Sequence, residues 1–261
     1  MEAALWVAKT GLDAQQTQMT VTSHNLANVN TTGYKKSRAA FNDLLYQNVN
    51  QVGGATSQTT QSPTGLQLGT GVRVVATEDS YTQGTLNTTG NSLDLAVNGQ
   101  GFFQILMPDG TMAYTRDGDF QLNAQGQVVN SSGYALQPGL TIPQNAQSVT
   151  IGADGAVTVL MPGQTAPTQV GTIQLANFIN PAGLQKLGGN LAAESASSGT
   201  PVTGTPGLNG LGSLSQGTLE ASNVDVVEEM VNMIETQRAY EMNSKAVQTT
   251  DQMLQFAAQN M

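Results

Sequence analysis

The sequence predicts an α+β protein with a long helix at each end, extended arms beside the helices and a central antiparallel β domain. Apolar residues recur at every seventh position at both ends, and the last 38 residues contain no glycine or proline. The middle instead alternates with period two and is divided by turn-forming residues. These patterns divide the chain into a terminal helical domain (1–35 and 222–261), an arm or connector domain (36–91 and 186–221) and a β domain (92–185).

The N-terminal helix is expected over residues 3–30. Leu5, Leu12, Met19 and Leu26 are spaced by seven, and the positions three residues after them are mostly small or polar. A stripe this narrow buries too little apolar surface to stabilise a helix alone, which favours pairing with a second helix. An ordinary helix packed on a globular core is the alternative.

The C-terminal helix is expected to begin near Ser222, where a polar residue is followed three places later by Asp225. Its apolar stripe repeats every seven residues from Val226 to Met261, which predicts a coiled coil with the N-terminal helix, parallel or antiparallel. Further apolar residues lie outside this stripe and favour packing against copies of the chain. The residues expected to serve helix pairing and polymerisation are Leu5, Leu12, Met19, Leu26, Met230, Met233, Ile234, Tyr240, Val247 and Leu254.

The two connecting arms are rich in Gly, Ser, Thr and Gln. We expect a solvated turn at the basic cluster of Lys35, Lys36 and Arg38, a short helix over 39–47 and an extended arm over 48–71. A second arm is expected over 188–212. The tetrapeptide at 83–86 recurs at 216–219, and this places the outgoing and returning arms side by side unless the repeat arose by chance.

The β domain is predicted from short alternating segments separated by turn signals such as Asp109-Gly110. Spacings of about eight to ten residues between these signals favour hairpin-connected antiparallel strands. The expected strands are 72–75, 93–97, 102–107, 111–116, 148–152, 156–160 and 170–178.

The composition excludes several functions. With 9 basic and 18 acidic residues the chain lacks the clustered cations that nucleic-acid binding requires. It has no cysteine, which excludes disulfides and thiolate chemistry. The first apolar run, residues 3–8, is too short for a signal peptide or a membrane span.

No catalytic, cofactor-binding or metal-binding residues are predicted. The one histidine, His24, cannot form a typical zinc site alone. Asp117-Gly118-Asp119 lacks the distal glutamate of an EF-hand and is better explained as a tight turn. Glu78 and Asp79 are adjacent on a strand and therefore point to opposite faces. We expect a protein that is not an enzyme.

Residues 22–35, TSHNLANVNTTGYK, closely resemble the N-terminal signature of the bacterial flagellar rod and hook family. Residues 84–103 resemble its second shared block, and residues 223–259 resemble its terminal helix. The residues that carry the N-terminal resemblance are Ser23, Asn25, Leu26, Asn28, Asn30, Gly33 and Tyr34. The match covers both ends and most of the centre.

The resemblance implies a structural subunit that assembles into a rigid, hollow helical drive shaft and transmits motor torque to the hook. The chain length and the arm over 46–71 favour the distal rod within the family, with the proximal rod or the hook as alternatives. Implied partners are copies of itself, proximal rod proteins, the hook or hook–rod junction, the P and L ring bushing, the type III export apparatus and the rod cap. The implied location is the basal body across the periplasm, reached without a cleaved signal peptide.

Two other classes of protein fit less well. A secreted β-rich adhesin with a helical stalk would need a secretion signal, which the sequence does not display. A peptidoglycan hydrolase would need converging carboxylates, which the sequence pattern does not provide.

Overall fold

The computed structural model describes residues 2–52, 64–164 and 166–259. The chain forms two compact units. The helical unit consists of Met1–Ala27, Ser37–Glu78 and Asp225–Met261, and the β unit consists of Asn28–Lys36 and Asp79–Val224. The predicted α+β class, with a helix at each end and a central antiparallel β domain, is confirmed. The coiled-coil geometry of the helices and the three-part division into domains stay predictions.

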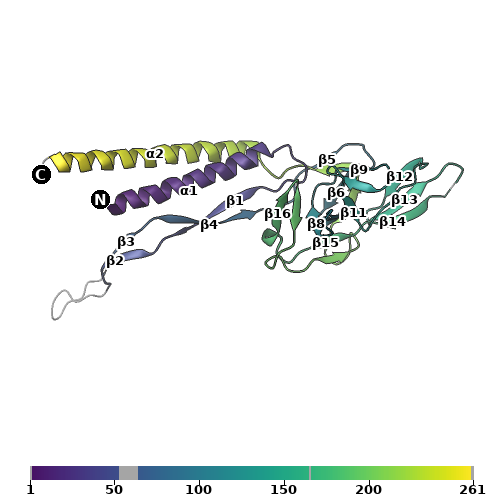
Figure 1. The fold of residues 1–261 in the computed structure, drawn as a ribbon, viewed down its shortest axis with the longest axis horizontal. Helices are drawn as coiled ribbons and strands as arrows, with labels where there is room; N and C mark the ends of the chain where they lie inside the picture. Colours follow the sequence, from purple (N-terminus) through teal and green to yellow (C-terminus); the bar gives the residue numbers. More distant parts are fainter. Residues whose placement is uncertain (1, 53–63, 165, 260–261) are drawn as a thin grey trace. The chain divides into compact units, whose positions relative to one another are not determined.

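The helical unit is built on α1 (Glu2–Ala27) and α2 (Val226–Gln259), which pack against each other. Their contacts run in opposite directions along the two helices. Asn25, near the end of α1, contacts Glu229 at the start of α2, and Gly11 lies against Asn243 further along. The helices are therefore antiparallel, with the purple and yellow ribbons of Figure 1 ending close to each other.

The start of α2 differs from the prediction. The Asp225 carboxylate caps the helix by accepting hydrogen bonds from the backbone N–H groups of Val227 (2.8 Å) and Glu228 (3.3 Å). Ser222 does not cap the helix, because its Oγ instead accepts a hydrogen bond from Val224 N. An acidic cap also interacts favourably with the positive end of the helix dipole, so Asp225 meets both requirements of a helix start.

The remaining part of the helical unit is a β ribbon. β1 (Ser37–Asp43) pairs with β4 (Val72–Asp79), and β2 (Tyr46–Asn50) pairs antiparallel with β3 (Leu66–Gly69). The short helix predicted over 39–47 is therefore wrong. Several of its residues, such as Ala39, Ala40 and Leu44, favour a helix locally, but the more distant strands β4 and β3 pair with β1 and β2 and supply inter-strand hydrogen bonds that decide in favour of β structure. Of the extended arm predicted over 48–71, residues 53–63 lie outside the described residues, and part of β2 and all of β3 lie in the rest.

The β unit contains a nine-stranded antiparallel sheet and several smaller ones. The main path of the large sheet is β16-β17-β8-β7-β11-β10-β9, with β15 joining β7 to β18. A three-stranded sheet has the order β12-β13-β14, and β6 pairs with β19 and β5 with β20. The strands are β5 Leu86–Thr88, β6 Leu95–Asn98, β7 Phe102–Leu106, β8 Met112–Thr115, β9 Phe120–Leu122, β10 Val128–Asn130, β11 Ala135–Gln137, β12 Ser148–Ile151, β13 Ala156–Leu160, β14 Thr168–Thr172, β15 Leu175–Asn177, β16 Gln185–Gly188, β17 Leu191–Ala193, β18 Val202–Gly204, β19 Ser213–Gln216 and β20 Thr218–Glu220; one 3-10 turn, η1, spans Pro181–Gly183.

Several strand predictions are confirmed. The hairpin on either side of Asp109-Gly110 is formed by β7 and β8. β12 and β13 pair as neighbours, and the predicted segment 170–178 is divided between β14 and β15. Each repeated tetrapeptide overlaps one of two paired strands, β5 and β20, but the register places Leu86 opposite Glu220 and Leu219 opposite Asn87, so the tetrapeptides do not pair with each other. The outgoing and returning segments are therefore neighbours here, and whether the repeat arose by chance is not decided by the structure.

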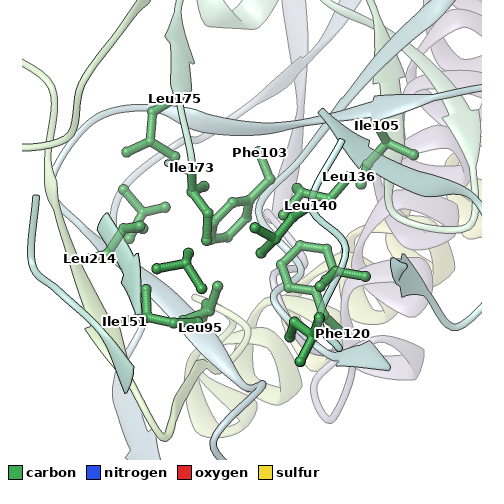
Figure 2. Close-up of a cluster of buried hydrophobic side chains, with 14 of the residues drawn as sticks. Leu95, Phe103, Ile105, Phe120, Leu136, Leu140, Ile151, Ile173, Leu175 and Leu214 are labelled. Carbon is green, nitrogen blue, oxygen red and sulfur yellow. The ribbon is translucent and has the colours of Figure 1, made fainter. Parts of the chain in front are cut away.

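The core of the β unit is a cluster of aliphatic and aromatic side chains contributed by several sheets (Figure 2). At its centre Phe103 packs edge-on against Phe120, with ring centroids 5.1 Å apart. A second, smaller cluster around Phe102 and Phe178 is also arranged edge to face. This apolar interior gives the β unit a core of its own, whereas the helical unit buries few large apolar side chains among its described residues.

Candidate assembly surfaces and the signature segment

The first half of α2 exposes large apolar side chains. Val227 is 71%, Met230 51% and Ile234 48% exposed, and Val231 and Met242 are exposed as well. Full burial of such a side chain from full exposure contributes about 1.5–3 kcal/mol, so completing the burial of a half-exposed one would contribute roughly half of that. A row of this size on one helix is typical of a surface that packs against another protein.

The β ribbon exposes a second group of apolar side chains. Leu45 is 89% exposed, and Tyr46, Val49, Leu66 and Leu68 on β2 and β3 are also exposed. Both edges of a two-stranded ribbon leave backbone groups without partners in the ribbon itself. The ribbon is therefore a second surface suited to contacts with other subunits.

The fully buried side chains of α1 and α2 are few, and all of them are small or polar. On α1 the buried side chains are Ala14, Thr22 and Asn25, and on α2 they are Glu229 and Thr236. The Oγ of Thr22 has no hydrogen-bond partner among the described residues. Apart from Ala14, the described apolar side chains of the two helices are half-buried or exposed in the single chain.

The residues predicted for pairing and polymerisation differ in how far their side chains are exposed. Their side chains on α1 are half-buried, as are two on α2, whereas three on α2 are exposed. The half-buried set is Leu5, Leu12, Met19, Leu26, Met233 and Val247, the exposed set is Met230, Ile234 and Tyr240, and the side chain of Leu254 lies outside the described residues. Their role in pairing and polymerisation stays a prediction.

Asn25 holds three segments of the helical unit together. Its Oδ1 accepts a hydrogen bond from Ser37 N (2.9 Å), and its Nδ2 donates to Ser37 O (2.8 Å) and to Glu229 Oε1 (3.3 Å). The side chain is 2% exposed, so water cannot replace these partners at low cost. One side chain thus connects the end of α1, the start of β1 and the first turns of α2.

The signature segment, residues 22–35, continues into the β unit, where the backbone at Gly33 packs closely against other backbone atoms. This glycine has φ of +67°, and a Cβ there would lie 2.6 Å from Asp117 N, so a side chain is excluded by both conformation and space. Its N–H donates to Glu220 O at 2.8 Å. Tyr34 is buried, with the Lys186 ammonium 5.4 Å from its ring centroid.

The other signature residues have smaller roles in this structure. Asn28 caps the turn that follows α1, since its side chain and carbonyl accept hydrogen bonds from Thr31. Ser23 and Asn30 are exposed. The structure gives no account of why these two positions carry Ser and Asn.

Lys35 belongs to a buried ionic cluster, which corrects the prediction of a solvated turn. Its Nζ donates to Glu220 Oε1 (2.6 Å) and to Thr82 O (2.7 Å), and Arg116 Nη1 lies 3.4 Å from Glu220 Oε2. Gly84 N also donates to Glu220 Oε1 at 2.9 Å. The three charged side chains are each at most 5% exposed. The prediction failed because the acidic partner lies 185 residues away in the sequence.

Burial and the Glu220 carboxylate have opposing effects on the pKa values of the two cations in this cluster. It lowers the pKa of Lys35 below the ordinary value, while the hydrogen bond and the charge of Glu220 act in the other direction. Burial also lowers the pKa of the Arg116 guanidinium, against the attraction of Glu220. Neither cation would be stable in this interior without the carboxylate.

Asn223 ties the same region together without charge. Its Oδ1 accepts a hydrogen bond from Lys36 N (2.7 Å), and its Nδ2 donates to Ser80 O (2.8 Å) and Thr82 Oγ1 (2.9 Å). Its backbone N–H also donates to Tyr34 O at 3.4 Å. Together with Glu220 it fastens the end of the signature segment to residues 80–84 and 220–223.

The acidic side chains of Asp117, Glu78 and Asp79 form hydrogen bonds or ion pairs with neighbouring residues. Asp117 accepts hydrogen bonds from Thr32 Oγ1 (2.8 Å) and Asn190 Nδ2 (3.3 Å). Glu78 pairs with Arg38, and Asp79 pairs with Lys186. Within residues 2–52, 64–164 and 166–259, no three His, Asp or Glu side chains come close enough to share a metal ion.

His24 lies on an exposed face of α1. In the part of the chain that the structure describes, neither α1 nor α2 contains a stretch apolar enough to cross a membrane.

Comparison with known proteins points to one family. Residues 5–35 match the flagella basal body rod protein family, residues 96–159 match the D1 domain of the flagellar hook protein FlgE/F/G, and residues 215–260 match the C-terminal region of the flagellar basal body rod FlgEFG proteins. The chain is 56% identical over 259 residues to the flagellar basal-body rod protein FlgG of Buchnera aphidicola subsp. Schizaphis graminum, an alignment that covers 99% of this chain and 100% of that protein. It is 46% identical to FlgG of Borreliella burgdorferi, with 98% of both chains covered, and 39% identical to FlgG of Bacillus subtilis, with 98% and 97% covered.

The chain belongs to the flagellar basal-body rod protein family. It is a structural subunit of the distal rod of the flagellar basal body, and it assembles there with other flagellar components.

The three matched regions correspond to distinct parts of the rod protein. The first covers α1 and the signature segment, the second runs from β6 to β13, and the third covers β19, β20 and α2. Sequence reasoning identified Asn25 only through the family resemblance, and Gly33 both through the resemblance and as a glycine suited to the left-handed end of the N-terminal helix. It missed Glu220, Arg116 and Asn223, for which the one available signal was the repeated tetrapeptide that precedes Glu220.

Proposed function

We propose that this rod protein polymerises with copies of itself into a rigid, hollow helical shaft that transmits motor torque to the hook. The exposed apolar side chains of α2 carry this proposal, because Val227, Met230 and Ile234 stay about half or more exposed in the single chain. Their burial between neighbouring subunits would supply a large driving force for assembly. The exposed ribbon residues Leu45, Tyr46, Val49, Leu66 and Leu68 offer a second contact, and two contacts per subunit allow a helical assembly.

The proposal includes the partners and the location of the shaft. The subunit would join proximal rod proteins at one end and the hook or hook–rod junction at the other, and it would turn inside the P and L ring bushing. It would reach the growing tip through the flagellar type III export apparatus, without a cleaved signal peptide, and be placed there beneath the rod cap across the periplasm. The protein acts as a structural element and not as an enzyme. The family membership and the apolar faces of the helical unit support this reading.

The experiment replaces Val227, Met230 and Ile234 together by serine in a flagellated host that lacks its own distal rod protein. We expect no distal rod in purified basal bodies, because the apolar contact between subunits is lost. The control replaces three polar or charged residues of the same helix, Gln237, Arg238 and Glu241, by serine. Rods of normal length with the first variant would refute the proposal.

A further inference from the structure

Among the described residues of α1 and α2 one apolar side chain, that of Ala14, is fully buried, so polar contacts can contribute to the register of the two helices. Gly11 lies against Asn243, where a Cβ on Gly11 would be 3.2 Å from the side-chain amide nitrogen. Glu229, Thr236 and Asn243 are spaced by seven and so share one face of α2.

Buried polar groups can select the register of two packed helices where apolar packing does not select one. A buried amide that loses its partners costs free energy, and a single asparagine between two helices is known to select one register of a coiled coil. Asn25 is such a residue: it is buried, and its hydrogen bonds to Ser37 and Glu229 use both its acceptor and its donors. Glu229 is within reach of Asn25 only when residue 25 of α1 lies opposite residue 229 of α2, and Ser37 is within reach only when the end of α1 lies beside the start of β1.

Nearer its other end, α1 also contacts the β ribbon through a polar side chain, that of Thr10. Thr10 Oγ1 accepts a hydrogen bond from Val72 N at 3.4 Å, and the adjacent Gly71 approaches so closely that a side chain there would collide with Thr10. This contact is long and involves one hydrogen bond. Asn25 makes hydrogen bonds at 2.8, 2.9 and 3.3 Å to β1 and α2, so it contributes more to the attachment of α1 than Thr10 does.

We infer that Asn25 is a positioning residue that sets the register of α1 against α2 and β1. The inference rests on the proposed assembly, because the register decides which apolar side chains a subunit presents to the next one. A subunit with α1 shifted by one turn would still have two helices and a folded β unit, but its contact surface would be altered.

The test reads the register directly by disulfide formation in the full-length chain, which has no cysteine of its own. Gly11→Cys with Asn243→Cys reports the observed register, and Gly11→Cys with Val247→Cys reports a shift of one turn. Cross-links are measured in the purified chain and in rods where the cysteine-bearing chain is a minority beside the wild-type chain. An intramolecular disulfide keeps the monomer mass on a non-reducing gel, which separates it from links between subunits.

Asn25→Asp is the central variant, because it keeps the shape but places a carboxylate against Ser37 O and Glu229. We expect it to raise the ratio of shifted to native cross-links about tenfold, as expected for the loss of a buried hydrogen-bonded pair. Adding Glu229→Gln gives the new carboxylate at position 25 a donor again and should return the ratio towards that of the wild type. Leu26→Ala removes neighbouring apolar packing and should leave the ratio unchanged.

An unchanged ratio in Asn25→Asp would overturn the inference, as would an equal change in Leu26→Ala or no recovery with Glu229→Gln. These results differ from a failure of the proposed function. If the wild-type chain itself is absent from rods, the assembly proposal fails, while the cross-links in the purified chain still decide the role of Asn25.

Discussion

Glu220→Gln should destabilise the β unit strongly, because Glu220 is the anion that both buried cations of the cluster share. Its carboxylate lies 2.6 Å from Lys35 Nζ and 3.4 Å from Arg116 Nη1, and it accepts a further hydrogen bond from Gly84 N. The amide keeps the shape but leaves two buried cations without this counter-charge. Removing one partner of a buried ion pair costs about 3–5 kcal/mol, and this range is our expected loss in the free energy of unfolding.

The assay is urea unfolding of the full-length chain, followed through the near-ultraviolet circular dichroism of tyrosine. Four of the six tyrosines, at positions 34, 81, 114 and 134, lie in the β unit and report on it. Lys35→Met combined with Glu220→Leu is the matched control, because it removes the anion and one cation together. We expect this double variant to lose less stability than Glu220→Gln alone.

The pH dependence follows from the pKa of Lys35. Burial already lowers this pKa below its ordinary value of 10.5, and Glu220 is the group that opposes the shift, so its removal should lower the pKa further. Between the lowered pKa and 10.5 the unfolded chain binds more protons than the folded one, so stability rises with pH in that window. The difference between Glu220→Gln and the wild type should therefore shrink from about pH 7 to about pH 10. A loss below about 1 kcal/mol at pH 7, or a difference that grows with pH, would refute this account of the cluster.

Three further predictions concern the β unit. Gly33→Ala should cost more stability than Gly133→Ala, because both glycines have positive φ but only at Gly33 would a Cβ lie 2.6 Å from the backbone nitrogen of Asp117. Thermal unfolding of both variants measures the two losses, and equal losses would contradict this prediction. Burial raises the pKa of Tyr81, so the wild type should lose stability as pH rises above about 10, when the unfolded chain releases that proton first, and Tyr81→Phe should reduce this loss in urea titrations between about pH 9 and pH 11; an equal loss in both proteins would show that Tyr81 is not responsible. Phe103→Ala removes a fully buried ring and should cost about 3–5 kcal/mol of unfolding free energy, whereas a loss below about 1 kcal/mol would mean that the core refills the space.

Local patterns in the sequence were enough to predict the β7–β8 hairpin of the β unit. The alternation over 102–107 and 111–116 and the Asp-Gly between them give the β7–β8 hairpin, because a hairpin is specified by residues that are close in the sequence. The segment over 39–47 was misread as helical for the opposite reason. Its strand state depends on β4, which is distant in the sequence, and no local signal records that pairing.

The assembly surface was only partly predictable. The surplus of apolar residues on the C-terminal helix indicated that some would remain exposed, and Met230 and Ile234 are among those that do. Periodicity could not say which stripe faces α1. In the structure that position is taken by Glu229, Thr236 and Asn243, whose small or polar side chains fit a close helix contact.

By itself the sequence determined two long terminal helices, a hairpin-rich middle and membership of an axial flagellar family, since periodicity and signature motifs are properties of neighbouring residues. Only the tertiary structure decided that the helices run antiparallel, that Asn25 connects α1 with β1 and α2, and that Lys35 is buried against Glu220. Each of these contacts joins residues that are separated in the chain. Their free energy depends on burial and on the geometry of both partners, and neither can be read from one segment alone.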